Sequence, residues 1–200
     1  MTSPHLDHLI ATHPGSASLQ VVFVDIVGYA KRKRATQFSV INEFTKLVNA
    51  SLEQLGRKHE EYATLRGIDF HRDVIRVATG FGLAVVFTFE ELPSVASDFT
   101  GLMAQAAAQH NRQVHCRQFE KALWCNCHPA FQVNVTLREG QGVIYREMNE
   151  IYSVADSTVD FSQRIPGRGI PGSDDDRGEG VGAAVGRSPG PQPGFLRIEL

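Results

Sequence analysis

One carboxylate stands inside an apolar run near the N-terminus. Asp25 interrupts the stretch Val21–Val27, whose other residues are all apolar. Burying a carboxylate in a strand is costly, so an aspartate at this place is expected to have a function. A carboxylate at the end of a buried strand, followed by a glycine turn such as the one at Gly28, commonly holds a divalent cation beside a phosphate-binding loop. The alternative is an edge-strand aspartate that faces water.

A second group of possible ligands lies further along the chain. The residues of types that bind Zn²⁺ are His115, Cys116, Cys125, Cys127 and His128. The Cys-x-Cys spacing is tighter than the usual gap in structural zinc sites. The plainer interpretation is a loop with reduced thiols, anchored on the core by Trp124.

Four consecutive basic residues, Lys31 to Arg34, follow the first apolar run. The run is short, has no interleaved aromatic residues and belongs to a chain of net charge −2, which argues against a nucleic-acid surface. We expect a solvated turn before a helix. Contact of one of these side chains with a nucleotide phosphate is the alternative.

The periodicity of apolar residues predicts the elements that must position these groups. A strand is predicted at about 20–27, and a helix at 36–55 that ends at a C-cap glycine, Gly56. Strands at 73–78 and 83–89 are predicted to form a hairpin around Thr79–Gly82, because glycines allow positive φ angles. The other predicted elements are a helix at 93–110, an irregular segment at 111–130, strands at 131–137, 143–145 and 151–154, and a short helix at 157–163.

The composition is that of an ordinary chain with one well-cored domain. The 200 residues are 42% hydrophobic, and the near-neutral charge gives no general attraction to nucleic acid or membranes. Neither a signal peptide nor a membrane span is expected, so a cytoplasmic location and reduced cysteines follow. Residues 1–18 are expected to be a mobile lead-in and residues 19–165 the domain. Residues 166–200, rich in glycine and proline, are expected to be disordered.

Three segments together resemble the catalytic domain of class III nucleotidyl cyclases. Phe23–Lys31 resembles the first-strand motif of that family, in which an aspartate, the carbonyl after it and a glycine turn hold two metal ions and the triphosphate. Arg76–Phe87 is similar to the hairpin that carries the second metal-binding aspartate. Ser153–Arg164 is similar to the helix start that supplies an asparagine and, four residues later, an arginine. The order and spacing agree across about residues 20–165.

The resemblance implies a role for each matching position. Asp25 and the carbonyl of Ile26 would bind Mg²⁺ or Mn²⁺. Gly28 and Tyr29 would hold the triphosphate of ATP or GTP. Arg164 would offset the charge that develops in the transition state.

The chain departs from the family pattern at several positions. Phe81 stands where the second aspartate is expected, and a phenyl ring cannot coordinate a hard cation. Asp160 replaces the asparagine, so an anion stands in place of a hydrogen-bond donor. The purine-selecting lysine is replaced by Val77, and Arg76 would substitute for it only if the register shifts. Ser153 aligns with the polar partner of that lysine.

The sequence therefore predicts an α+β fold. By resemblance this is a ferredoxin-like βαββαβ core, with helices on one face of a mainly antiparallel sheet and a truncated or replaced C-terminal part. The predicted function is a cyclase-like domain, impaired in converting ATP or GTP to a cyclic nucleotide, that binds nucleotide or acts as a dimer. The dimer would be a homodimer or a heterodimer with another cyclase domain, because the family's sites form between two chains. The alternatives are an interaction module without a nucleotide site, or a structural zinc-binding protein.

Overall fold

The computed structural model describes residues 2–113, 124–127, 129–156 and 196–199. The helices are α1 Pro4–Thr12, α2 Arg34–Lys58, α3 Glu60–Arg66 and α4 Val95–Arg112, with a 3₁₀ turn, η1, at Tyr29–Lys31. The strands are β1 Ala17–Ile26, β2 Ile75–Ala78, β3 Gly82–Phe87, β4 Val133–Arg146, β5 Tyr152–Asp156 and β6 Leu196–Glu199. No helix in these ranges is long and apolar enough to cross a membrane.

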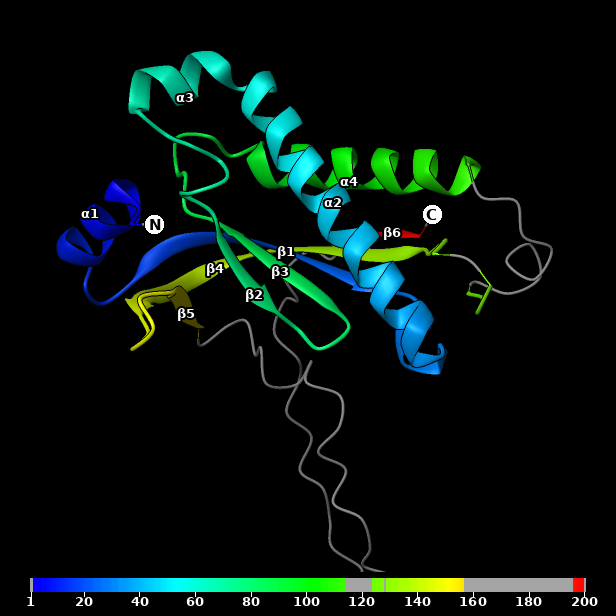
Figure 1. Cartoon of the computed structure of the whole chain (residues 1–200). Coiled ribbons are helices and arrows are strands. Elements are labelled where there is room, and N and C mark those ends of the chain that lie inside the picture. The colour runs from blue at the N-terminus through cyan, green and yellow to red at the C-terminus, as the bar shows by residue number, and fades with distance from the viewer. Residues whose placement is uncertain (1, 114–123, 128, 157–195, 200) are drawn as a thin grey trace, which may run out of the picture.

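The strands form one antiparallel sheet with β1 in the middle. Their order is β2-β3-β1-β4-β5, and β6 pairs with β4 beside Asn134–Leu137. Helices α2 and α4 lie together over one face of this sheet (Figure 1). The sheet is curved, so that its outer strands β2 and β5 approach each other, with residue pairs within 8 Å between Cα atoms. The structure thus confirms the expected α+β class and the mainly antiparallel sheet.

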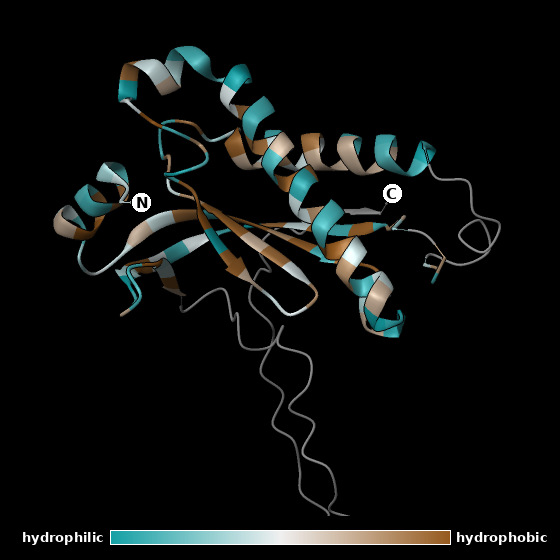
Figure 2. Ribbon diagram, in the orientation of Figure 1, coloured by the Kyte–Doolittle hydropathy of each residue, from teal (hydrophilic) through white to brown (hydrophobic). Residues whose placement is uncertain are grey.

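Alternation along β1 divides the core into two clusters. Val22, Val24 and Ile26 face α2 and α4 and belong to the larger cluster. Val21 and Phe23 point to the opposite face and pack with residues of β2, β3, β4 and β5 in the second cluster. Figure 2 shows hydrophobic residues concentrated on the central strands. Asp25 therefore belongs to the face that α2 and α4 do not cover.

The long helix α2 exists as predicted and packs one apolar stripe against the sheet. Val40, Phe44, Val48, Leu52 and Leu55 lie three or four positions apart and pack into the larger cluster. Phe38, in the first turns of the helix, is 69% exposed. The helix also continues through Gly56 to Lys58, so the predicted C-cap at that glycine is wrong. The His59 main-chain N–H still donates to the Leu55 carbonyl at 3.0 Å, so the helical hydrogen bonds run past the glycine.

The N-terminal residues, expected as a mobile lead-in, form a helix in the structure. Ser3 caps α1, since its side chain accepts a hydrogen bond from the Leu6 main-chain N–H. The Leu6 side chain is 1% exposed and completes the second cluster. Strand β1 then begins at Ala17, three residues earlier than predicted. Burial against the sheet, which local sequence does not reveal, stabilises this short helix.

Asp73 connects α1 to the rest of the domain. It precedes β2 instead of starting it, and its side chain is fully buried. Its carboxylate accepts hydrogen bonds from the Ser3 hydroxyl at 2.7 Å, from the Arg72 guanidinium and from the Asp69 main-chain N–H. Burial alone would raise the pKa of Asp73, but these hydrogen bonds together hold it below its ordinary value. A buried carboxylate with this many donors is a structural anchor.

The C-terminal half differs from the prediction in its strands. Strand β4 is continuous, whereas the sequence predicts two strands at 131–137 and 143–145. Between the two predicted strands, Gly140 and Gly142 pair with Leu19 and Ala17 of β1. Within the segment expected to be disordered, 196–199 form β6. The short helix predicted at 157–163 lies outside the described residues.

Candidate active site

Asp25 lies at the end of the central strand. It pairs with Gly82 of β3 on one side and with Asn134 of β4 on the other. Directly paired residues of neighbouring strands point to the same face, so the Asp25 carboxylate and the Asn134 amide share the face opposite α2 and α4. The carboxylate is partly exposed. A ligand can therefore reach this group.

Two neighbours of Asp25 were not identified from the sequence. The Thr79 hydroxyl donates to Asp25 Oδ1 over a long distance of 3.4 Å. Asn134 faces Asp25 from β4, and its signal was a polar residue inside a predicted strand. Both add neutral oxygen atoms beside a single carboxylate.

The β2–β3 hairpin reaches the same strand end. Gly80, at φ +80°, makes the turn that the sequence predicts. Gly82 has a different role, because a Cβ atom there would lie 1.9 Å from the Val24 carbonyl oxygen. The Ile26 main-chain N–H donates to the Phe81 carbonyl at 3.0 Å, which holds the hairpin tip beside the end of β1. The Phe81 ring packs against Tyr29, with 5.9 Å between ring centroids.

The turn after β1 is fixed by tight packing. Gly28 adopts the left-handed conformation at φ +65°, and a Cβ atom there would lie 2.6 Å from the Trp124 ring. The turn then enters η1, where the Lys31 N–H donates to the Gly28 carbonyl. Among the described residues, no main-chain acceptor is found for the N–H groups of Tyr29 and Ala30. Trp124 thus packs against this turn.

The basic run was expected to be a solvated turn, but one of its four residues is buried. Arg32 is only 4% exposed and donates to the carbonyls of Cys125 and Ala130, at 3.1 and 2.9 Å. Burial lowers the pKa of its guanidinium, although the nearby Cys125 opposes this. Lys31, Lys33 and Arg34 are exposed. One arginine therefore ties the turn after β1 to the segment around Cys125.

The other candidate residues are not gathered around Asp25. Arg76 pairs with Val85, so it faces α2, where it donates to the Asn49 side chain at 3.1 Å. Ser153 alternates with Tyr152 and Val154, which pack in the second cluster, so it points to the opposite face from them. Val77 shares the face of Asp25 but packs on the second cluster. Asp160 and Arg164 lie outside the described residues.

The side chains around Asp25 do not fit a two-metal clamp. Within the described ranges, no three His, Cys, Asp or Glu side chains come close enough together to hold a metal ion. Phe81, which the resemblance aligns with the second carboxylate, has no oxygen ligand in its side chain. For the zinc alternative, Cys125 is buried and Cys127 exposed, while His115, Cys116 and His128 lie outside the described residues.

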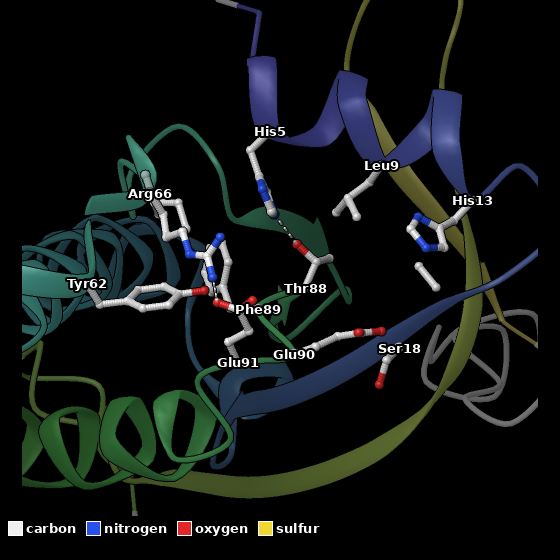
Figure 3. Close-up of a pocket in the computed structure, with 12 residues that line it drawn as sticks. His5, Leu9, His13, Ser18, Tyr62, Arg66, Thr88, Phe89, Glu90 and Glu91 are labelled. Carbon is white, nitrogen blue, oxygen red and sulfur yellow. Dashed lines mark hydrogen bonds and ion pairs between the residues drawn. The ribbon is translucent and has the colours of Figure 1, made fainter. Parts of the chain in front are cut away.

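A cleft of about 300 Å³ opens at the other end of β1 from Asp25, where α1, α3 and the loop after β3 meet (Figure 3). His5 Nε2 lies 2.9 Å from the Thr88 hydroxyl, and the imidazole is 5.1 Å from the Phe89 ring between centroids. Arg66 forms an ion pair with Glu91 at its wall. Since the cleft adjoins the first residues of β1, it is separate from Asp25.

Acidification should lower the free energy of unfolding of the domain through His5 of α1. Burial lowers the pKa of His5, and although Asp73 opposes this, His8 adds to it. The unfolded chain, with an ordinary histidine pKa near 6.5, therefore takes up this proton first as the pH falls. We expect the His5 contribution to be complete above about pH 6.5 and to be lost as the pH falls from there through the lowered folded-state pKa.

Urea unfolding between pH 5 and 7.5 measures this effect. His5→Gln should flatten the pH dependence in that window, whereas His8→Gln, at an exposed position, should retain most of it. An unchanged slope in His5→Gln would contradict the assignment.

Comparison with known proteins gives matches at the level of structure. One solved structure similar to this chain is that of a bacterial light-regulated adenylyl cyclase, with 12% identity, a TM-score of 0.52 and coverage of 76% of this chain and 70% of that one. Another is the guanylate cyclase domain of RhGC from Catenaria anguillulae in complex with GTP, at 14% identity, a TM-score of 0.46 and coverage of 74% and 72%. No protein-family model matches the sequence, and no curated protein matches it. The likeness to the light-regulated enzyme shows that this chain has the fold of nucleotidyl cyclase domains.

Proposed function

We propose that this chain is a class III cyclase-like domain that binds a purine nucleoside triphosphate but turns it over poorly or not at all. The observation that carries the proposal is the position of Asp25, at the end of the central strand and beside a hairpin tip, within a cyclase fold. The element order β1-α2-β2-β3-α4-β4, with strand order β2-β3-β1-β4, supports a ferredoxin-like core.

Nucleotide binding is supported by the turn after β1. The N–H groups of Tyr29 and Ala30 have no main-chain acceptor in the described part of the chain. Donors of this kind, next to a left-handed glycine, suit the oxygen atoms of a phosphate group. In this proposal Gly28 and Tyr29 hold the triphosphate. Ser153 and Arg76, which face away from Asp25, are not used to read the base.

Loss of turnover is supported by what the site lacks. Cyclisation requires an in-line attack of the ribose 3′-hydroxyl on the α-phosphate, with charge on the attacking and leaving oxygens stabilised by cations. One missing preorganised electrostatic contact commonly costs about 10²- to 10³-fold in rate. Phe81 and Asp160 both replace such contacts. We therefore assign the domain a binding role and not a catalytic one.

A dimer follows from the same proposal. In the family that the chain resembles, one subunit supplies the metal aspartates and the other supplies the asparagine and arginine. A homodimer would contain two impaired sites, whereas in a heterodimer Arg164 could serve the intact metal pair of another cyclase domain. The partly exposed end of β1 at Asp25 is where such a partner would lie.

Thermal unfolding with added nucleotide tests this function. ATP or GTP should raise the midpoint temperature in a concentration-dependent way, because a ligand that binds only the native state stabilises it. Adenosine and guanosine, which lack the triphosphate, serve as controls and should have little effect. No cyclic nucleotide should form from either triphosphate with Mg²⁺ or Mn²⁺.

Two outcomes would separate the alternatives. Absence of any nucleotide-dependent stabilisation would favour an interaction module without a nucleotide site. Metal-dependent formation of cyclic AMP or cyclic GMP that disappears in Asp25→Ala would show an active enzyme.

A further inference from the structure

A cavity of about 280 Å³ lies between α2 and the β2–β3 hairpin. The residues that line it are Ile41, Phe44, Thr45, Val48, Asn49, Arg76, Ala78, Gly82 and Leu83. Leu83 pairs with Val24 and Arg76 with Val85, so both side chains lie on the helix-covered face of the sheet. The cavity is therefore on the opposite face from Asp25, and the inference drawn from it does not depend on nucleotide binding.

The body of the cavity is apolar on both walls. Phe44 and Val48 of α2 are buried at its base, and Ile41 and Leu83 are partly exposed beside them. Ala78, at the end of β2, is exposed and presents only a methyl group. Apolar side chains left partly open in this way gain free energy when a ligand covers them. The walls thus favour a hydrocarbon or aromatic body.

One cation stands at the edge of this apolar surface. The Arg76 guanidinium donates to the Asn49 side chain at 3.1 Å and to the His71 carbonyl at 3.3 Å. In the described part of the chain no carboxylate pairs with Arg76. Arginine has five N–H donors, so two neutral acceptors leave donors for an anion. Asn49 and His71 also restrict the guanidinium, which lowers the entropy lost on binding.

We propose that this cavity binds a small amphipathic monocarboxylate, such as a medium-chain fatty acid. Its apolar body lies between Ile41, Phe44 and Leu83, and its carboxylate accepts hydrogen bonds from Arg76. Charge complementarity decides the class of ligand, because an apolar cleft with one cation at its rim favours an anion over a cation of the same shape. The cavity is at the lower end of the size range of small-molecule sites, which suits a short chain.

The chosen probes are octanoate and octylammonium, which share the apolar body and differ in the sign of the charge. Calorimetric titration of the full chain should show octanoate binding more tightly. Arg76→Gln should weaken octanoate binding about 10-fold or more, because a hydrogen bond to a charged group is lost, and should not weaken octylammonium binding. Arg57→Gln, at an exposed arginine on α2 that pairs with Glu53, is the matched control and should bind octanoate like the wild type.

A second variant tests the cavity without changing charge. Ala78→Trp should fill the entrance and abolish octanoate binding, and the exposure of Ala78 makes the larger side chain compatible with folding. In NMR titrations of the wild type, the amide signals of Gly82 and Leu83 should shift with octanoate.

Three results would overturn the proposal. These are octylammonium binding as tightly as octanoate, octanoate binding undiminished in folded Ala78→Trp, and no octanoate binding at millimolar concentration. A dimer that dissociates when octanoate is added, or in Ala78→Trp, would instead identify a second copy of the chain as the occupant.

Discussion

Phe81→Asp should bind Mn²⁺ about 10- to 100-fold more tightly than the wild type, because affinity for hard cations rises with the number of charged oxygen ligands. The hydrogen bond from the Ile26 N–H to the Phe81 carbonyl holds residue 81 beside the strand end that carries Asp25. A second carboxylate there would join the first near Thr79 and Asn134. Calorimetric titration of both proteins with Mn²⁺ measures the gain.

Two controls locate the new site. Phe81→Asn has a similar shape without the charge and should gain little. Asp25→Asn in the Phe81→Asp background should remove the gain, because both carboxylates are needed. If a folded Phe81→Asp protein binds Mn²⁺ no more tightly than the wild type, Thr79–Gly82 does not correspond to the metal-binding hairpin of the cyclases. The cyclase interpretation of the site would then be wrong.

Formation of a cyclic nucleotide should require a second substitution in addition to Phe81→Asp. In the proposed site, Asp160→Asn would supply a hydrogen-bond donor and remove an anion. The gain in cyclic-nucleotide production by the double variant should therefore exceed the sum of the gains of the two single variants, because both residues act on one transition state. Cyclic-nucleotide production by the four proteins at saturating Mn²⁺ gives the comparison.

Gly82→Ala should destabilise the domain by more than about 3 kcal/mol, among the larger effects of single substitutions. The added Cβ would lie 1.9 Å from the Val24 carbonyl oxygen and 2.8 Å from the Asp25 Cα atom. Both contacts are with main chain, so no side chain can rotate away. Strand β3 would have to separate from β1 at the place where the hairpin meets Asp25.

Gly101→Ala is the matched control for this substitution. A Cβ atom at Gly101, within α4, meets no atom within 4 Å, so alanine should stabilise the helix by about 0.5–1 kcal/mol. Urea unfolding followed by circular dichroism compares the two variants. Equal stability of Gly82→Ala and the wild type would contradict the close approach of β3 to β1 at this glycine.

Local patterns were sufficient for the elements that carry Asp25. The apolar run of β1, the four-residue spacing in α2 and the glycines of the hairpin are each visible over a few neighbouring residues. The same patterns failed where a distant contact decides the structure. Helix α1 depends on Ser3 and Leu6 meeting residues around Asp73 and the sheet, and the continuous β4 depends on pairing with Ala17 and Leu19.

The candidate site also contains residues that local sequence reveals and residues that only contacts between distant parts of the chain bring together. Asp25, Gly28 and Phe81 could be proposed from the sequence because they lie within short motifs. Asn134 was missed because its proximity to Asp25 arises only from the pairing of β1 with β4. Arg32 was expected to be solvated because it belongs to a run of basic residues. It is buried instead, and it donates to two carbonyl groups more than ninety positions away.

The curvature of the sheet has a consequence for how the protein behaves in concentrated solution. A sheet that ends in free strands can recruit further strands from other molecules and grow into an aggregate. Here the outer strands β2 and β5 come within 8 Å of each other between Cα atoms. A strand inserted between them would need about 9.6 Å, twice the spacing of paired strands. The two edges therefore shield one another, and where they meet, a passing chain finds no room for edge-to-edge addition.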